Sequence, residues 1–285
     1  MYEQISIPDS VKKQFDLSGR SAVITGGAGF LGIQFAEAIS EMNGKPILID
    51  INQKSLEEAS KILNQKNHNN FSTYSLDLTD EDDCISLYSD IWEENDGIDI
   101  LINCAALTKH GIEISDADFF AKFEDTNQEL WEKGIKINLT VSQISCKILG
   151  KKMAEKGKGN IINIASDIGV ISPNQNIYIP DDNGYKGVDF NSPAFYAVSK
   201  AGIIHLTKYL ATYWAKNNVR VNCISPAGVF RGHDDSFVKK LSEQIPMGRM
   251  ALPGEFKGAI IYLCSDASSF VTGHNLLIDG GRTIW

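Results

Sequence analysis

The feature that most constrains the fold is an alternation of short β-branched segments with helical patterns, which runs from residue 21 to near the end of the chain. Helical patterns fill residues 30–42, 54–66, 80–95, 127–156, 194–217 and 254–265. Strands are predicted at SAVIT, KPILID, FSTYSLDL, IDILINCAA, NIINIAS, VRVNCIS and NLLIDGG. Strands that alternate with helices form parallel sheets with both faces covered. The sequence therefore predicts an α/β fold: a doubly wound parallel sheet of about seven strands with helices on both faces.

No linker rich in Pro, Gly or Ser divides the alternation, so one domain is predicted over residues 1–285. Four segments lie outside the alternation: an N-terminal extension at 1–14 and connections at 107–126, 172–193 and 230–245. In open α/β sheets the ligand lies beyond the carboxyl ends of the strands. We therefore expect the three connections to be substrate-side loops, the last of them a mobile lid. Surface segments without ligand contact are the alternative.

The charge and composition of the chain indicate which kinds of partner it can bind. The formal net charge of −9 disfavours nucleic acid and anionic membranes, which attract basic surfaces. No apolar run approaches the roughly 20 residues that span a bilayer, and the polar N-terminus does not resemble a signal peptide. The five cysteines are scattered and never spaced C-x-x-C, which indicates reduced thiols. We expect a cytoplasmic protein with a small-molecule substrate and no metal site.

A glycine-rich loop, AVITGGAGFLG at 22–32, joins the first predicted strand to the first predicted helix. It fits two spacings, Gly27-x-Gly29-x-x-Gly32 and Thr25-Gly26-x-x-Gly29-x-x-Gly32. Glycine permits a tight turn and the close approach of a pyrophosphate, which the helix N-terminus attracts. Asp50 ends the next strand, where a carboxylate accepts hydrogen bonds from the adenosine ribose and repels a 2′-phosphate. We therefore expect NAD, with NADP the less favoured cofactor.

Tyr196 and Lys200 are four residues apart in PAFYAVSKAGIIHL, so they share one face of a predicted helix. A nearby ammonium favours the phenolate and lowers the pKa of a tyrosine, which lets the pair move a proton near neutral pH. Taken alone, Y-x-x-x-K is a frequent chance spacing. Its meaning depends on the motifs around it.

The ordered motifs resemble the single-domain short-chain dehydrogenase/reductase family over about residues 14–285. The matching segments are TGGAGFLG, Asp50, LDL at 76–78, NCAA at 103–106, Asn138 in KINLT, Ser166 in NIAS, YAVSK, SPAGV at 225–229 and VTGHNLLIDGG. This series selects the glycine spacing that begins at Thr25. The resemblance implies a Rossmann-type fold and an NAD(P)-dependent enzyme that acts on a CH–OH group.

The resemblance also implies roles for the catalytic residues. Tyr196 is implied to be the general acid in carbonyl reduction and the base in alcohol oxidation. Lys200 is implied to hold the nicotinamide ribose, and Ser166 to hydrogen-bond the reacting oxygen. Asn138 is implied to fix a water that links Lys200 to solvent.

The implied cofactor contacts follow the same motifs. Asp77 would bind the adenine amino group beside Leu78, while Asn103 and Ala105 would line the adenosine ribose side. The Val229 backbone would meet the carboxamide. The remaining implied contacts are Gly26, Gly29, Phe30, Leu31, Gly32, Asp50, Tyr196 and Lys200.

The substrate is less constrained than the cofactor. Four charged or ionisable side chains could meet an anionic group, or form a solvated helix face: Arg231, His233, Lys239 and Lys240. A narrower resemblance to bacterial flagellin-modification dehydrogenases of nonulosonic-acid pathways suggests a sugar, with a sugar phosphate or nucleotide sugar as candidates. The glycine spacing also resembles nucleotide-sugar epimerases and dehydratases that retain NAD, and a noncatalytic dinucleotide sensor is a third hypothesis. The family resemblance implies a homodimer or homotetramer.

Overall fold

The computed structural model describes residues 7–109, 113–179 and 190–285. Its centre is a sheet of seven strands, in the order β3-β2-β1-β4-β5-β6-β7, with every neighbouring pair parallel. The strands are β1 Ser21–Thr25, β2 Lys45–Asp50, β3 Ser72–Ser75, β4 Ile100–Asn103, β5 Gly159–Ile164, β6 Val219–Pro226 and β7 Asn275–Ile278. The predicted doubly wound parallel sheet is confirmed. The order reverses beside β1, which places the ligand crevice at the carboxyl ends of β1 and β4.

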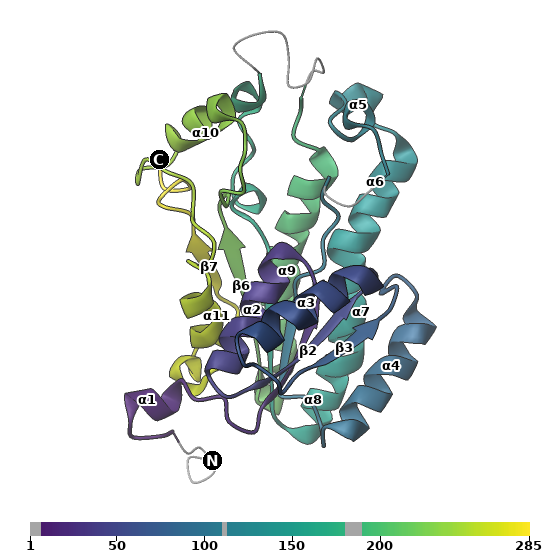
Figure 1. Cartoon of the computed structure of the whole chain (residues 1–285), viewed down its shortest axis with the longest axis vertical. Helices are drawn as coiled ribbons and strands as arrows, with labels where there is room; N and C mark the ends of the chain where they lie inside the picture. Colours follow the sequence, from purple (N-terminus) through teal and green to yellow (C-terminus); the bar gives the residue numbers. More distant parts are fainter. Residues whose placement is uncertain (1–6, 110–112, 180–189) are drawn as a thin grey trace.

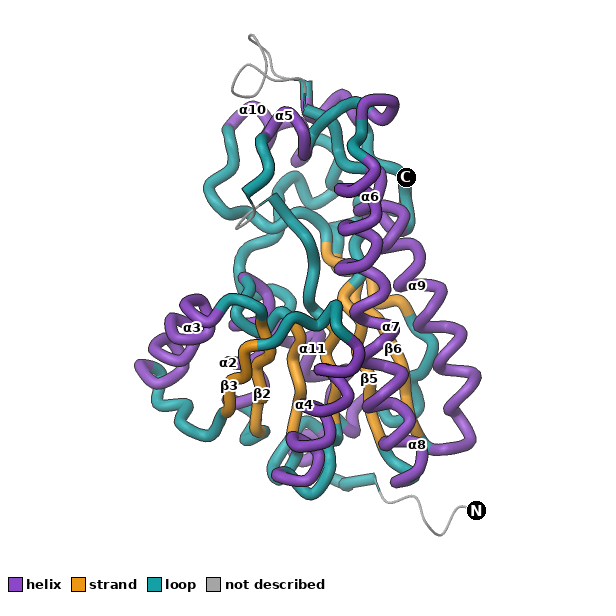
Figure 2. The backbone as a smooth tube through the Cα atoms, turned by 90° about the vertical axis from the view of Figure 1, so that its right-hand side faces the viewer, coloured by secondary structure: helices purple, strands orange, loops and turns teal. Residues whose placement is uncertain are grey.

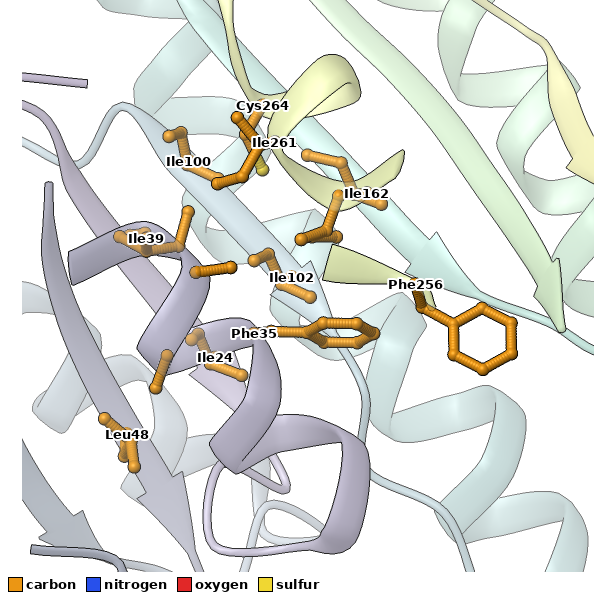
Figure 3. Packing of buried hydrophobic residues seen from close by; sticks show 14 of the residues in the cluster. Ile24, Phe35, Ile39, Leu48, Ile100, Ile102, Ile162, Phe256, Ile261 and Cys264 are labelled. Carbon is orange, nitrogen blue, oxygen red and sulfur yellow. The ribbon is translucent and has the colours of Figure 1, made fainter. Parts of the chain in front are cut away.

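Successive residues of the central strands point to opposite faces, and each face has its own helices. Ile24 and Ile102 pack under α2 Phe30–Glu41, α3 Gln53–Gln65 and α11 Lys257–Cys264. Figure 3 shows Phe35 of α2 directed toward the strand residues of this cluster. Val23 and Leu101 pack on the other face against α4 Glu81–Glu94, α7 Val141–Ser145, α8 Lys151–Lys156 and α9 Ala194–Trp214.

The long helix predicted over 127–156 is present, but it is not regular. It consists of α6 Gln128–Ile135, a π turn η3 at Lys136–Thr140, α7, a second π turn η4 at Cys146–Gly150, and α8. The junction residues keep right-handed helical angles, so the chain continues without a break. π turns inside α-helices occur often at functional sites, and the first of these contains Asn138.

The strand predicted at FSTYSLDL is shorter than expected. β3 pairs only with β2 and ends at Ser75. Beyond it, Asp77 Oδ1 accepts a hydrogen bond from the Thr79 backbone at 2.9 Å, and the Leu78 side chain is buried in the core. The turn at Asp77 therefore ends the edge strand.

Three short elements lie beyond the carboxyl edge of the sheet, in the segments expected to be loops (Figure 2). They are α5 Asp116–Phe119, η6 Gln175–Tyr178 and α10 Asp235–Ser242. The segment 230–245 therefore contains a regular helix where a loop was expected. Residues 110–112 and 180–189 of the other two connections lie outside the described residues. In the N-terminal extension, α1 covers Val11–Gln14, and residues 1–6 lie outside the description.

No helix in the described ranges has the length and apolar character needed to cross a bilayer. All five cysteines are free thiols, as expected.

Candidate active site

The glycine loop turns tightly between β1 and α2. Gly26 has φ of +62°, and a Cβ there would come within 2.7 Å of the Ala105 Cα. A Cβ on Gly32 would overlap the carbonyl oxygen of Gly26. Both positions therefore require glycine for close backbone packing. Thr25 supports the turn, because its Oγ1 accepts hydrogen bonds from the Cys104 and Ala105 backbones at 3.1 and 3.3 Å.

The start of α2 is arranged to receive an anion. Gly29 is its N-cap and carries no side chain that could cap the first-turn N–H groups. Those groups and the helix dipole favour a phosphate at this end. The Asp50 carboxylate lies beside the loop, where Oδ2 accepts a hydrogen bond from the Ala28 backbone at 3.2 Å. The residues present therefore fit a dinucleotide, with its pyrophosphate at the helix and a ribose at Asp50.

One cavity of about 420 Å³ joins the glycine loop to the predicted catalytic residues. The predicted site residues that line it are Gly26, Gly29, Phe30, Leu31, Gly32, Asp50, Ser166, Tyr196, Lys200 and Val229. A second cavity of about 860 Å³ lies beside the first and shares Thr108, Tyr178, Tyr196 and Arg231 with it. Both volumes are in the range of small-molecule sites. Tyr196 lines both cavities and therefore lies where they meet.

Tyr196 and Lys200 come from α9, and Ser166 follows the end of β5. Lys200 is 3% exposed, and its Nζ donates a hydrogen bond to the Ile164 carbonyl at 2.7 Å. The same nitrogen lies 5.5 Å from the centre of the Tyr196 ring. The helical spacing thus brings both residues to the carboxyl end of β5.

Protonation of this pair differs from the sequence-based expectation. The pKa of Tyr196 is raised to about 12, chiefly by burial and next by the Asp167 carboxylate, while a hydrogen bond with Ser166 opposes the rise. Burial lowers the pKa of Lys200 to about 8. The expected lowering of the Tyr196 pKa by Lys200 is therefore wrong for the protein alone, because burial dominates the shift and Lys200 is not among the groups that cause it.

Asn138 lies in the π turn η3 and is 1% exposed. Its Oδ1 accepts a hydrogen bond from the Leu107 backbone at 2.5 Å. Its Nδ2 has no partner among the described residues. An unpartnered buried donor fits the predicted water, and that role stays a prediction.

Four predicted cofactor contacts do not belong to the cavity lining: Asp77, Leu78, Asn103 and Ala105. Leu78 packs in the core, and Asn103 donates hydrogen bonds to Asn163 at 2.8 Å and to Cys146 at 3.2 Å. The Ala105 backbone is held by Thr25. These residues lie beyond or at the carboxyl ends of β3 and β4, and their roles stay predictions.

The three connections contact one another through aromatic rings. The ring centres of Phe120 and Phe190 are 3.7 Å apart, and those of Tyr178 and Phe190 are 4.9 Å apart. Tyr178 also stacks on Phe237 of α10 at 5.6 Å. Together these rings form one wall of the larger cavity.

The charged residues of 230–245 contact protein groups. The Arg231 guanidinium lies 4.2 Å from the centre of the Phe30 ring, which places it above the start of α2. Lys240 donates a hydrogen bond to the Ile179 carbonyl at 2.5 Å. The sequence offered an anionic substrate group for four side chains of this segment. Arg231 and His233 line both cavities, whereas Lys239 and Lys240 line neither.

The sequence did not identify Asp167 and Arg282, which both line the smaller cavity. Their side chains form an ion pair at 2.7 Å and are 4% and 5% exposed. An acidic residue directly after a buried strand was a visible signal for Asp167. Nothing local marks Arg282, because its partner lies 115 residues away.

A Rossmann-type sheet whose dinucleotide cradle opens into the same cavity as a Ser–Tyr–Lys set defines a nicotinamide-dependent oxidoreductase. Comparison with known proteins agrees. Residues 20–179 match the family described as "short chain dehydrogenase", and residues 183–283 match "Enoyl-(Acyl carrier protein) reductase". The chain belongs to the short-chain dehydrogenase/reductase family and is an enzyme.

Two curated relatives illustrate the similarity. The "NAD-dependent glycerol dehydrogenase" of Listeria innocua is 31% identical over 95% of this chain and 97% of its own length. The "D-threitol dehydrogenase" of Mycolicibacterium smegmatis is 30% identical over 96% and 97%. Neither is a flagellin-modification dehydrogenase, and that narrower resemblance gains no support.

Two solved structures show the same fold. A short-chain dehydrogenase from Leptospira borgpetersenii with bound NAD+ is 33% identical, covers 99% of this chain and 98% of its own, and superposes with a TM-score of 0.80. An NADPH-dependent 3-quinuclidinone reductase from Rhodotorula rubra is 27% identical, with coverage of 99% and 98% and a TM-score of 0.80. Structural relatives of this chain therefore include users of either cofactor.

Proposed function

We propose that the protein interconverts a secondary alcohol and a ketone on a polyol or sugar-like substrate, with NAD as the cofactor. The observation that carries this proposal is the shared cavity, which brings the glycine loop and Asp50 together with Ser166, Tyr196 and Lys200. Bound NAD+ would accept a hydride from the alcohol carbon, and NADH would return it. The protein supplies orientation and proton transfer.

Each residue has a role set by its place in the cavity. The Tyr196 phenolate oxygen takes the proton of the substrate alcohol in oxidation, and the Tyr196 hydroxyl so formed returns it in reduction. Ser166 hydrogen-bonds the same oxygen. The Lys200 ammonium, held on the Ile164 carbonyl, places a positive charge beside the Tyr196 ring. It would also hold the nicotinamide ribose.

The substrate class rests on the relatives and on the size of the site. The glycerol and threitol enzymes are 31% and 30% identical to this chain over nearly its full length. The two adjoining cavities accommodate a small polar chain together with the nicotinamide. The relatives give no support to a sugar phosphate or nucleotide sugar, so neither is proposed. We assign the substrate wall to the three connections, as part of one domain.

The preference for NAD rests on Asp50. Its carboxylate ends β2 and lines the cavity beside the glycine loop. A 2′-phosphate at this position would face a negative charge, whereas the ribose hydroxyls of NAD donate hydrogen bonds to it.

A substrate panel tests the proposed function. Linear polyols such as glycerol, D-threitol and xylitol are assayed with NAD+ and with NADP+ by absorbance of the reduced nicotinamide, and the matching ketoses are assayed in reverse. Tyr196→Phe is expected to lower turnover by about 10²- to 10⁴-fold and to change NADH affinity by less than about threefold. Tyr262→Phe, on α11, is the matched control. Near-normal turnover by Tyr196→Phe on an identified substrate would contradict the mechanism.

We also propose a homodimer or homotetramer that buries the outer face of α9. Val198, Tyr209 and Tyr213 of this helix are each more than half exposed in the single chain. The two tyrosine rings stack with their centres 6.1 Å apart. Exposed aromatic patches of this kind mark interfaces.

A further inference from the structure

We propose that Asp167 is a positioning residue for the Ser166 hydroxyl, and that Arg282, from the C-terminal end of the chain, holds Asp167 in place. The proposal rests on the function proposed above, in which Ser166 contacts the reacting oxygen. Neither residue belongs to the Ser–Tyr–Lys set, yet both line the same cavity.

Both oxygens of Asp167 are engaged. Oδ1 accepts hydrogen bonds from the Ser166 hydroxyl at 2.9 Å and from the Ile168 backbone at 2.8 Å. Oδ2 accepts one from Arg282 Nη1 at 2.7 Å. Because the whole residue is only 2% exposed, no solvent competes for these bonds. A carboxylate held at three points fixes the direction in which Ser166 donates its proton.

This direction decides what Ser166 can do at the substrate. A serine hydroxyl has one proton and two lone pairs. In the protein alone that proton is directed at Asp167, so Ser166 donates to the substrate oxygen only when its hydroxyl turns from Asp167, and the alcohol proton stays available to Tyr196. Asp167 therefore fixes the position of the Ser166 oxygen and governs how readily the Ser166 proton is released to the substrate oxygen.

Arg282 is placed by the turn that follows β7. Asp279 Oδ1 accepts a hydrogen bond from the Gly281 backbone at 2.9 Å, and Oδ2 accepts one from the Thr283 backbone at 2.8 Å. This turn directs Arg282 back toward the end of β5. A buried carboxylate needs a counter-ion, and Arg282 is the one that the described residues supply. The C-terminal turn thus becomes part of the active site.

The two charges act on Tyr196 with opposite signs. The Asp167 carboxylate raises the pKa of Tyr196, and the Arg282 guanidinium partly offsets this carboxylate. Among the described residues, Cys104, Tyr178 and Lys200 also lie near Tyr196. Arg231 and His233 line the same two cavities. Removal of each partner alone therefore has a distinct consequence for the pH at which Tyr196 becomes a base.

The test uses Asp167→Asn, Arg282→Gln and the double variant in the full-length enzyme. In alcohol oxidation, kcat rises with pH as Tyr196 loses its proton, so this rise, the acidic limb of the plot of kcat against pH, reports the pKa of Tyr196. We expect this limb to move to lower pH in Asp167→Asn and to higher pH in Arg282→Gln, by about one unit each, as one charge near a partly buried group implies. The double variant removes both buried charges, so it tests the proposal even if a single variant does not fold. Its limb should lie near the wild-type position.

A second readout separates positioning from general damage. Asp167→Asn should lower kcat about 10- to 100-fold, the range seen for partners that orient reacting groups at metal sites, and change KM for NAD+ by less than about threefold. In a Ser166→Ala background, measured at a pH above the acidic limb where the Tyr196 pKa has no effect on kcat, the same substitution should change kcat by less than about twofold, because the positioning effect passes through Ser166. The control is Arg20→Gln/Asp266→Asn, an ion pair before β1 at the opposite edge of the sheet.

Two results would overturn the proposal: no change in kcat or in the acidic limb in any of the three variants, or an equal loss of kcat with and without Ser166. The proposed function is judged separately, by wild-type turnover and by Tyr196→Phe. If the wild type turns over a polyol and Tyr196→Phe does not, but the Asp167 and Arg282 variants keep wild-type kcat and pH dependence, only the inference about Asp167 and Arg282 is wrong.

Discussion

Replacement of Lys200 by methionine should make the folded protein more stable at neutral pH while it abolishes activity. Lys200 is 3% exposed, and burial lowers its pKa from 10.5 to about 8. Each unit of this change corresponds to about 1.4 kcal/mol, so the charged side chain costs about 3 kcal/mol in the folded state. The active site therefore stores a destabilising charge.

Methionine removes this cost but also removes a hydrogen bond. Lys200 donates to the Ile164 carbonyl at 2.7 Å, and the loss of such a bond costs about 1–2 kcal/mol. The balance is a gain of about 1–2 kcal/mol for Lys200→Met at pH 7. For a chain of this size, that gain raises Tm by about 2–5 °C.

The gain should depend on pH with a definite sign. Below pH 8 the ammonium is charged in both the folded and the unfolded state, so the wild type carries the full penalty. Between about pH 8 and 10.5 the folded state releases its proton first, and the penalty disappears. The advantage of Lys200→Met should therefore shrink over this window, and at its upper end the wild type, which keeps the hydrogen bond, should be the more stable protein.

Urea unfolding followed by tryptophan fluorescence at a series of pH values measures this difference. Lys208→Met, at an exposed position on the same helix, is the matched control and should show no crossover. If Lys200→Met were destabilised by the same amount at every pH, the reasoning about the buried charge would be wrong.

Three further outcomes are expected. Asp50→Asn keeps the acceptor for the Ala28 backbone but loses the negative charge. The ratio of kcat/KM with NADP+ to kcat/KM with NAD+ should therefore rise about tenfold, which corresponds to one charge contact of about 1.4 kcal/mol. An unchanged ratio would contradict the role of Asp50. Gly32→Ala places a methyl group against the Gly26 carbonyl. It should weaken NADH binding at least about tenfold in a fluorescence titration and lower the free energy of unfolding by about 1–3 kcal/mol. The control Gly258→Ala, whose methyl group meets no atom within 4 Å, should change neither quantity. Tyr209→Lys/Tyr213→Lys should shift the oligomer toward monomer in light scattering, and retention of the wild-type mass would move the interface elsewhere.

The sheet and the cofactor cradle were predictable because their signals are local. Strand-forming runs end in turns, and the glycine spacing reflects contacts within a few residues, so Gly26, Gly32 and Asp50 were found from sequence alone. The four-residue spacing of Tyr196 and Lys200 likewise predicted that they share one face of a helix, and in the structure the two side chains lie side by side. The roles of these residues in catalysis remain predictions.

The remaining features depend on the three-dimensional arrangement. The π turn at Asn138 changes backbone hydrogen bonding without a marker in the sequence. The pKa of Tyr196 depends on burial that only the packed α9 and β5 create, so reasoning from Lys200 alone gave the wrong sign. Asp167 and Arg282 are far apart in the sequence and form their ion pair only in the folded chain, so no periodic pattern of residues predicts it.

The stacked rings of Phe120, Phe190, Tyr178 and Phe237 have a consequence for protein engineering. They join three separate stretches of chain, so a change in one ring alters the support of the others. If one connection is replaced by that of a relative, the aromatic rings of the other two connections lose their stacking partners. A chimera that receives all three connections together preserves these contacts, and the three segments are therefore expected to diverge as a set.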